Sequence, residues 1–198
     1  MCIRDSSKGS TQKEFYFTRR PKLLTKKKLT PTERGIAAHK FMQFADFRHV
    51  QEDIDGEILR LTDMQFLSEE EGDFIDVNML TAFFESELGR RVLNAAQIYR
   101  EIRFMQEFTP KELAKINSEF TVSGTIVVQG VADCIIVEND KGTLIDYKTD
   151  FVKSPDELIT RYKDQLELYK VILENLLNIQ IEEKVIYSFA LGKAINVI

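Results

Sequence analysis

Residues 127–150 read VVQGVADCIIVENDKGTLIDYKTD, and this stretch decides the fold. It consists of two apolar runs rich in β-branched residues, separated by the short turn-forming segment Asn139–Gly142. Strand-like runs on either side of such a segment predict a β-hairpin. We expect Asp140 and Lys141 to be the two loop residues of this hairpin.

The expected register places three charged residues on one face of the hairpin. Asp133 faces Lys148, and Asp146 projects from the same side because side chains alternate along a strand. The two carboxylates are then diagonal neighbours, about 7–8 Å apart at the backbone, and both can reach one cation. A three-residue loop would reverse the faces, unless a bulge at Gly142 restored them.

The surroundings of these charges favour a functional role. Both runs are apolar on their two faces, a pattern typical of central, buried strands. A buried carboxylate is costly unless it is paired or bound to a metal. The alternative is a surface hairpin with scattered charges. The pattern predicts a divalent-metal site formed by Asp133 and Asp146, with Lys148 beside it as a cationic catalyst.

The composition is that of an ordinary globular protein. The chain has 198 residues, of which 43% are hydrophobic and 30% charged, enough for one domain with a core. No apolar run approaches the roughly 20 residues that span a bilayer, so no membrane partner is expected. The two cysteines, Cys2 and Cys134, fit a reducing cytoplasm and are too few for a four-cysteine iron–sulfur cluster.

Charge is unevenly distributed along the chain. The formal net charge is −5, yet residues 1–40 contain eleven Lys and Arg against three Asp and Glu. We expect residues 1–29 to be a disordered basic segment or linker, and residues 30–198 to form one domain. An acidic body is unfavourable for phosphate contacts. The basic run at residues 19–28 is either a DNA contact or a solvated linker.

Helix and strand signals predict an α/β fold in which helices pack around a short sheet. A proline and an acid in the first turn start a helix at residues 30–31, which continues to residue 44. The further elements expected are helices near 52–60, 62–70 and 76–98, a strand at 99–108, a short helix at 110–116, the hairpin, a long helix at 155–177, and strands near 182–190 and 194–197.

Four motifs in this order resemble the RecB-type branch of the PD-(D/E)XK nucleases. They are GIAAH ending at His39, GVAD ending at Asp133, IDYKTD at residues 145–150 and QLELY at residues 165–169. The similarity runs from about Pro31 to the C-terminus and is greatest to the C-terminal nuclease domain of AddA-type helicase–nuclease subunits. It implies a restriction-endonuclease-like core with a short mixed sheet flanked by helices.

The resemblance also implies a Mg²⁺ or Mn²⁺ site. Its ligands would be His39, Asp133, Asp146 and the backbone carbonyl of Tyr147, and oxygen ligands suit these hard cations. By spacing alone, His39 is more readily a core or surface residue. Lys148 would orient the attacking water or stabilise the charge on the phosphate; its alternative role is a salt bridge to Asp133.

Four further residues are expected near the site. Gln165 and Tyr169 share a helix face because they are four residues apart, and in the family they position DNA or the active site, although Tyr169 also fits the apolar stripe of this helix. Glu101 resembles the acid of a family strand motif, but a surface pair with Arg103 explains it equally well. Arg161, one turn before Gln165, is a candidate phosphate contact.

By resemblance, the chain is a metal-dependent deoxyribonuclease, the exonuclease domain of a bacterial cytoplasmic helicase–nuclease that processes double-strand DNA ends for recombinational repair. It would cut single strands delivered by a helicase motor and work beside a second subunit. The chain has no G-x-x-x-x-G-K-[ST] loop, so the helicase domain would lie upstream. Two alternatives stay open: a catalytically silent DNA-binding scaffold of the same fold, and a stand-alone phage-type exonuclease.

Overall fold

The computed structural model describes residues 30–118 and 123–198. The basic segment expected at residues 1–29 lies outside the described residues. The elements in chain order are α1 (Pro31–Phe44), α2 (Phe47–Glu52), α3 (Ile54–Asp63), α4 (Glu69–Phe74), α5 (Val77–Glu85), α6 (Glu87–Asn94), β1 (Gln97–Phe108), α7 (Pro110–Ile116), β2 (Ile126–Glu138), β3 (Lys141–Lys148), α8 (Pro155–Leu177), β4 (Gln180–Ser188) and β5 (Lys193–Asn196). None of the described helices is long and apolar enough to cross a membrane.

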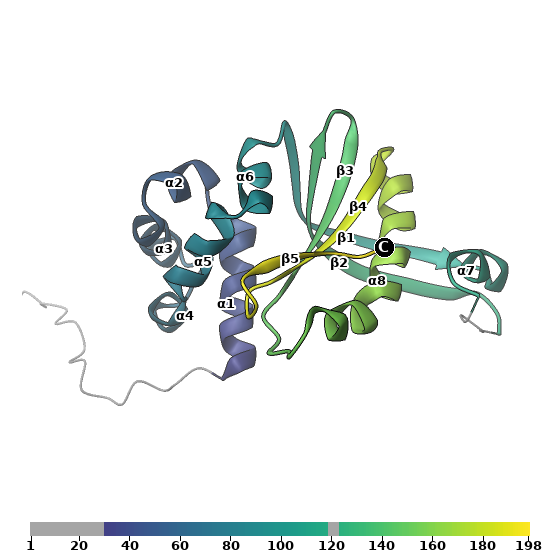
Figure 1. Ribbon diagram of the computed structural model, residues 1–198, viewed down its shortest axis with the longest axis horizontal. Helices are drawn as coiled ribbons and strands as arrows, with labels where there is room; N and C mark the ends of the chain where they lie inside the picture. Colours follow the sequence, from purple (N-terminus) through teal and green to yellow (C-terminus); the bar gives the residue numbers. More distant parts are fainter. Residues whose placement is uncertain (1–29, 119–122) are drawn as a thin grey trace, which may run out of the picture.

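The strands form one mixed sheet in the order β1-β2-β3-β4-β5. Neighbouring strands are antiparallel except β3 and β4, which are parallel. Parallel neighbours need a long crossover connection, and α8 supplies it. Helices α1 to α6 cover one face of the sheet and α7 and α8 the other, so the sheet separates two hydrophobic cores (Figure 1). This arrangement confirms the α/β fold with a short mixed sheet flanked by helices.

The start of α1 follows its sequence signal. The side chain of Thr30 accepts a hydrogen bond from the backbone N–H of Glu33, whose carboxylate accepts one from the backbone N–H of Thr30. This reciprocal capping box satisfies two backbone donors that the first turn leaves unpaired. The predicted ranges of α7 and α8 are also confirmed.

Two predicted helices are wrong in extent. Most of the helix expected at 62–70 is a turn, because α3 ends at Asp63 and α4 begins at Glu69. The helix expected at 76–98 is divided at Ser86, whose hydroxyl accepts a hydrogen bond from the backbone N–H of Gly89 and thereby caps α6. The chain turns tightly here: a Cβ on Gly89 would lie 1.9 Å from the carbonyl oxygen of Phe83.

The predicted register of the β2–β3 hairpin is wrong by two residues. The loop consists of Asn139 and Asp140, with φ of 51° and 63°, and Lys141 already pairs with Glu138. Two central residues with positive φ make a type I′ turn, whose twist matches that of the strands. Asn and Asp adopt this left-handed conformation more readily than Lys does, which explains the shift.

The corrected register changes which charged residues face each other. Continued beyond its last pair, it places Asp133 opposite Asp146, where the prediction had Lys148. A shift of two residues leaves the alternation of side chains unchanged, so Asp146 and Lys148 keep their expected common face.

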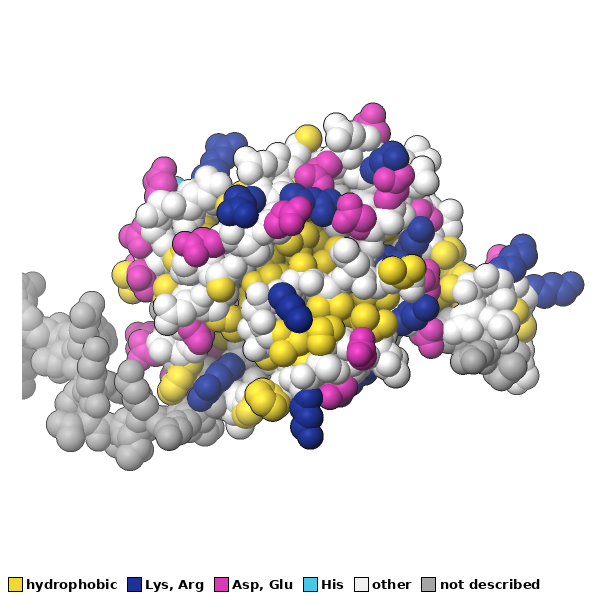
Figure 2. All heavy atoms as spheres, viewed as in Figure 1, with side chains coloured by type: hydrophobic (Ala, Val, Ile, Leu, Met, Phe, Trp, Pro, Cys, Tyr) yellow, Lys and Arg dark blue, Asp and Glu magenta, His cyan; other side chains and the backbone are white. Residues whose placement is uncertain are grey.

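Figure 2 shows the molecule from the same side as Figure 1. Apolar side chains gather over the middle of this face, where β4 and β5 lie in Figure 1, and charged side chains of both signs are interspersed around them. On this face, the described residues form no continuous basic surface that would attract a polyanion.

Candidate active site

Strands β1 and β2 exchange faces at one point of the sheet. In β1, Ile98 packs against the α1–α6 core, whereas Phe104, also even-numbered, belongs to the α8 core. In β2, Cys134 belongs to the α1–α6 core and Ala132 to the α8 core. The pairing register is the same on both sides of the change. The two-stranded ribbon therefore turns over between these positions without slipping.

Glu101 and Asp133 lie at the point where the strands turn over. Side chains alternate strictly along an extended strand, so a change of face requires a residue to leave the extended conformation. Glu101 does so with φ of 53°, and strained residues of this kind cluster at functional sites. On either side of Glu101 in β1, Tyr99 packs on the α8 core and Arg103 is exposed.

Helix α1 brings His39 to the same point. The helix approaches the end of β3 at Gly35, where a Cβ would lie 2.6 Å from Oγ1 of Thr149. Arg100 fixes the other end of α1 by donating hydrogen bonds of 3.2 and 2.7 Å to carbonyl oxygens there. The absence of a side chain at Gly35 therefore allows α1 to approach the end of β3 closely.

His39, Glu101 and Asp133 form a group that could hold a metal ion. One ligand atom from each side chain lies within 4.8 Å of the others, and Nδ1 of His39 lies 3.5 Å from Oδ1 of Asp133. An imidazole and two carboxylates are ligands for Mg²⁺ or Mn²⁺. The structure thus places Glu101 beside His39 and Asp133, two of the expected ligands.

Asp146 and Lys148 lie beside this group, on β3. The two are joined to each other: Nζ of Lys148 lies 2.7 Å from Oδ2 of Asp146, whereas the alternative prediction paired Lys148 with Asp133. Oδ2 is buried and accepts no well-aligned hydrogen bond from the described residues. Asp133 instead accepts a hydrogen bond of 2.8 Å, at Oδ2, from the backbone N–H of Tyr147.

The residues expected on α8 lie around this centre. Tyr169 stacks edge-on against Phe104, at 4.7 Å between ring centroids, and its hydroxyl comes so close to Gly130 that a Cβ there would lie 2.5 Å away. The glycine of the GVAD motif therefore makes room for Tyr169, and Gln165 hydrogen-bonds to this tyrosine. Arg161 lies at the rim, 4.0 Å from Oδ1 of Asp150.

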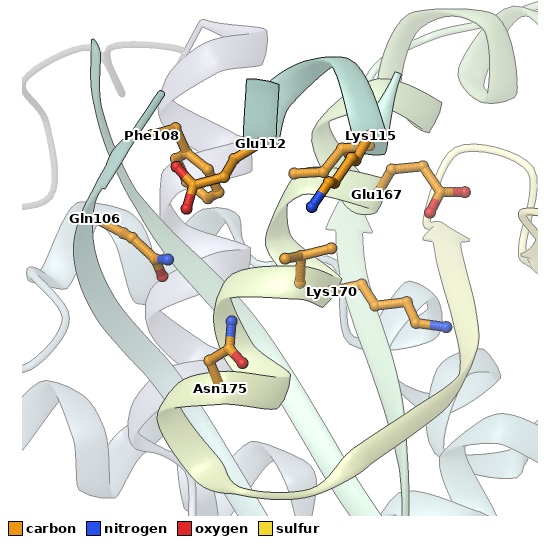
Figure 3. Close-up of a pocket in the computed structure, with 9 residues that line it drawn as sticks. Gln106, Phe108, Glu112, Lys115, Glu167, Lys170 and Asn175 are labelled. Atoms are coloured by element: carbon orange, nitrogen blue, oxygen red, sulfur yellow. The ribbon is translucent and has the colours of Figure 1, made fainter. Parts of the chain in front are cut away.

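Two cavities lie on different parts of the molecule. One, of about 620 Å³, is lined by His39, Glu101, Asp133 and residues of α1. The other, of about 440 Å³, lies between β1, α7 and α8, and its lining side chains are shown in Figure 3. Among the described residues, none lines both cavities, and the second is lined by none of the expected site residues. The first cavity is therefore the one that gives access to the candidate chemistry.

A profile of the PD-(D/E)XK nuclease superfamily matches residues 12–193 of the chain. The chain belongs to this superfamily. Its fold and its motifs, as quoted above, are therefore those of a PD-(D/E)XK nuclease domain.

Curated relatives of this nuclease domain are ATP-dependent helicase/nuclease subunits of the AddA type. The one from Bacillus cytotoxicus is 40% identical over 86% of the chain, and that from Thermoanaerobacter sp. (strain X514) is 37% identical over 89%. One from Clostridium botulinum (strain Hall) is 33% identical over 87%. The chain spans only 14–15% of the length of these relatives.

Burial and mutual charge shift the pKa values of the nuclease site. Burial raises the pKa of Asp146 to about 6, with a contribution from Asp133 and against the effect of Lys148. Burial also raises the pKa of Glu101, again with a contribution from Asp133. Burial alone would lower the pKa of His39 and Lys148, but the neighbouring carboxylates outweigh it and both are raised. The site therefore holds more negative charge than its cations balance.

Two residues of the nuclease site escaped sequence reasoning. Tyr162 was not expected near the site, but the centroid of its ring lies 4.3 Å from Nζ of Lys148. Arg100 carried no motif, yet it holds the end of α1 that positions His39. Tyr162 lies seven residues before Tyr169 on α8, and this helical spacing was a usable signal. For Arg100 we find none.

Proposed function

We propose that this nuclease domain is a deoxyribonuclease that depends on Mg²⁺ or Mn²⁺. The observation that carries the proposal is the convergence of His39, Glu101 and Asp133, from α1, β1 and β2, beside the Asp146–Lys148 pair of β3. Strand β1 adopts a strained conformation to bring Glu101 there. The fold itself does not require three potential metal ligands and a lysine to lie together, so their convergence supports a functional site.

The residues present fit a divalent cation. We assign His39, Asp133, Asp146 and the backbone carbonyl of Tyr147 as its ligands, with Glu101 adjacent. The carboxylate of Asp146 is buried, and its Oδ2 lies 2.7 Å from Nζ of Lys148; a buried carboxylate beside other acids is unfavourable unless cations compensate its charge. A bound cation of this kind lowers the pKa of a bound water and stabilises charge on the phosphate.

The protein's own groups orient the site. The hydrogen bond from the Tyr147 backbone to Oδ2 of Asp133 turns Oδ1 of this carboxylate towards His39. Lys148 supplies a positive charge that stabilises the charge developing on the scissile phosphate or orients the attacking water. Gln165, Tyr169 and Arg161, on α8, would contact DNA or support the site.

The relatives' names suggest the setting. We propose that the domain belongs to a helicase–nuclease that processes double-strand DNA ends for recombinational repair in the bacterial cytoplasm. A helicase motor would deliver single strands to the site, and a second helicase–nuclease subunit would work beside this domain. Exonuclease behaviour would then come from the delivery of strand ends by the helicase motor.

Cleavage of end-labelled single-stranded DNA tests the proposed activity. We expect cutting with Mg²⁺ or Mn²⁺ and none with EDTA, and products whose 5′-phosphate and 3′-hydroxyl ends a ligase joins without prior phosphorylation. Metal-dependent products that ligase cannot join until they are phosphorylated would contradict the assigned chemistry. Cutting that is equal in EDTA would exclude the metal.

Metal binding should weaken in acid. Asp146, with a pKa of about 6, must be ionised to bind a cation, and His39 must be neutral, so protons compete with the metal. We expect the Mn²⁺-induced rise in unfolding temperature to be smaller at pH 5 than at pH 7.5, with an affinity loss of about tenfold per pH unit for each proton displaced. Equal shifts at both values would argue against Asp146 as a ligand.

The same pKa has the opposite effect on the metal-free fold. The folded-state pKa of Asp146 is above its ordinary value of 3.8, so the folded chain binds the proton more tightly than the unfolded chain does. This stabilising contribution is present in acid and is lost as the pH rises through about 6. The contribution of Asp146 to stability should therefore change with pH in opposite directions in the metal-free and the metal-bound chain.

A further inference from the structure

We propose that Tyr162 is a positioning residue for Lys148: its ring holds the ammonium group in place when Asp146 binds the metal. This inference rests on the proposed metal-dependent nuclease function. It assigns a role to a residue of α8 outside the QLELY motif.

Lys148 lies between a carboxylate and an aromatic face. Its Nζ is 2.7 Å from Oδ2 of Asp146 and 4.3 Å from the ring centroid of Tyr162, and the side chain is only 16% exposed. A cation at this distance from a ring is attracted by the electron density of the face, and more strongly so when it is removed from water.

The ring of Tyr162 is itself fixed. Its hydroxyl donates a hydrogen bond of 2.8 Å to Oδ2 of Asp150, just beyond β3. Leu158 and Leu166, one turn of α8 before and after it, are fully buried and anchor the helix to the sheet. The half-exposed side chain of Arg161 lies 5.9 Å from the same ring centroid and 4.0 Å from Oδ1 of Asp150. Arg161 therefore lies next to both the ring and its hydrogen-bond partner.

Metal binding would remove one of the two contacts of Lys148. A divalent cation bound to Asp146 neutralises the carboxylate charge that attracts the ammonium of Lys148. It also repels this ammonium as a like charge. A lysine side chain has four rotatable bonds and loses much rotamer freedom when it is held in one position. The ring of Tyr162 is neutral and is not a ligand of the metal. Its contact with Nζ of Lys148 therefore remains when the metal binds, and it keeps Nζ beside the phosphate.

The test compares Tyr162→Leu with Tyr162→Phe in the 198-residue chain. Leucine keeps apolar contact with the α8 core but removes the aromatic face, whereas phenylalanine keeps the face and loses only the hydroxyl. We expect Tyr162→Leu to lower kcat by about tenfold, with KM and Mn²⁺ affinity unchanged. Tyr162→Phe should stay within about threefold of the wild type. Tyr162→Met replaces Tyr162→Leu if that variant fails to fold.

A second readout does not depend on activity. A lysine beneath a ring has upfield-shifted side-chain proton resonances, so the Lys148 signals of Mg²⁺-loaded protein should be shifted in the wild type and Tyr162→Phe, and unshifted in Tyr162→Leu. Wild-type kcat in Tyr162→Leu, or unshifted Lys148 signals in the wild type, would overturn the inference. If the wild type cleaves no DNA, the proposed function fails, and the resonances still decide whether the ring holds Lys148.

Discussion

Lys148→Ala should reduce DNA cleavage at least a hundredfold while metal binding stays nearly unchanged. Removing a preorganised charge that stabilises a transition state has effects of this size. Lys148 contacts Asp146 only through Oδ2, so its removal leaves the ligands in place and frees that oxygen. Single-turnover cleavage with saturating Mn²⁺, beside Mn²⁺ titrations of both proteins by thermal shift, measures the two quantities separately.

The outcome separates two roles for Lys148. If Lys148 served only to neutralise Asp146 in the folded chain, the variant would lose stability and keep its cleavage rate under conditions in which it is folded. Retained cleavage would remove Lys148 from the mechanism. Loss of both cleavage and metal binding would show that Lys148 organises the ligands.

Asp146→Asn should abolish the stabilisation that Mg²⁺ or Mn²⁺ gives to the wild type. A metal at about a hundred times its dissociation constant adds about 2.7 kcal/mol, which raises the unfolding temperature of a domain of this size by roughly 5–10 °C. An amide supplies no negative charge, and hard cations favour carboxylates. Differential scanning fluorimetry with and without metal measures the effect.

The matched control is Asp140→Asn, the same change at the other end of β3. Asp140 lies in the hairpin loop with φ of 63°, a conformation that asparagine also adopts readily. This variant should show the wild-type metal-induced shift. An unchanged shift in Asp146→Asn would move the metal to the group formed by His39, Glu101 and Asp133 alone.

Local signals in the sequence were sufficient for several of the elements and for the order of the motifs. These signals depend only on residues that are close in the sequence. They are the capping box at Thr30, the helix starts at Pro110 and Pro155, and the apolar stripe of α8. The same holds for the common face of Asp146 and Lys148, because the strand period of two is independent of the loop.

Features that depend on distant contacts could not be read in this way. The reversal of faces at Glu101 was hidden, since the neighbouring residues of β2 are apolar on both faces and give no sign of a change. Tyr162 was missed because its cation partner lies on another element, although its helical spacing from Tyr169 was a usable signal. The hairpin loop, by contrast, could have been read locally, because Asn139 and Asp140 both take positive φ and suit this conformation better than Lys141 does.

The acidic character of the chain gives the metal its importance. The site gathers Glu101, Asp133 and Asp146 around His39 and Lys148, within a chain whose net charge is −5. A phosphate backbone is repelled by such a site unless cations compensate. A divalent ion and Lys148 would supply this compensation where the strand is cut, which explains why catalysis and DNA binding should both require metal.

The most direct test of the central claim is cleavage of labelled single-stranded DNA by the wild type and by Asp146→Ala, each with Mn²⁺ and with EDTA. We predict cutting by the wild type with Mn²⁺ alone, and none by the variant under either condition. Cutting by Asp146→Ala at the wild-type rate would contradict the assigned metal site. A folded wild type that neither binds Mn²⁺ nor cuts DNA would instead be a scaffold with a nuclease fold.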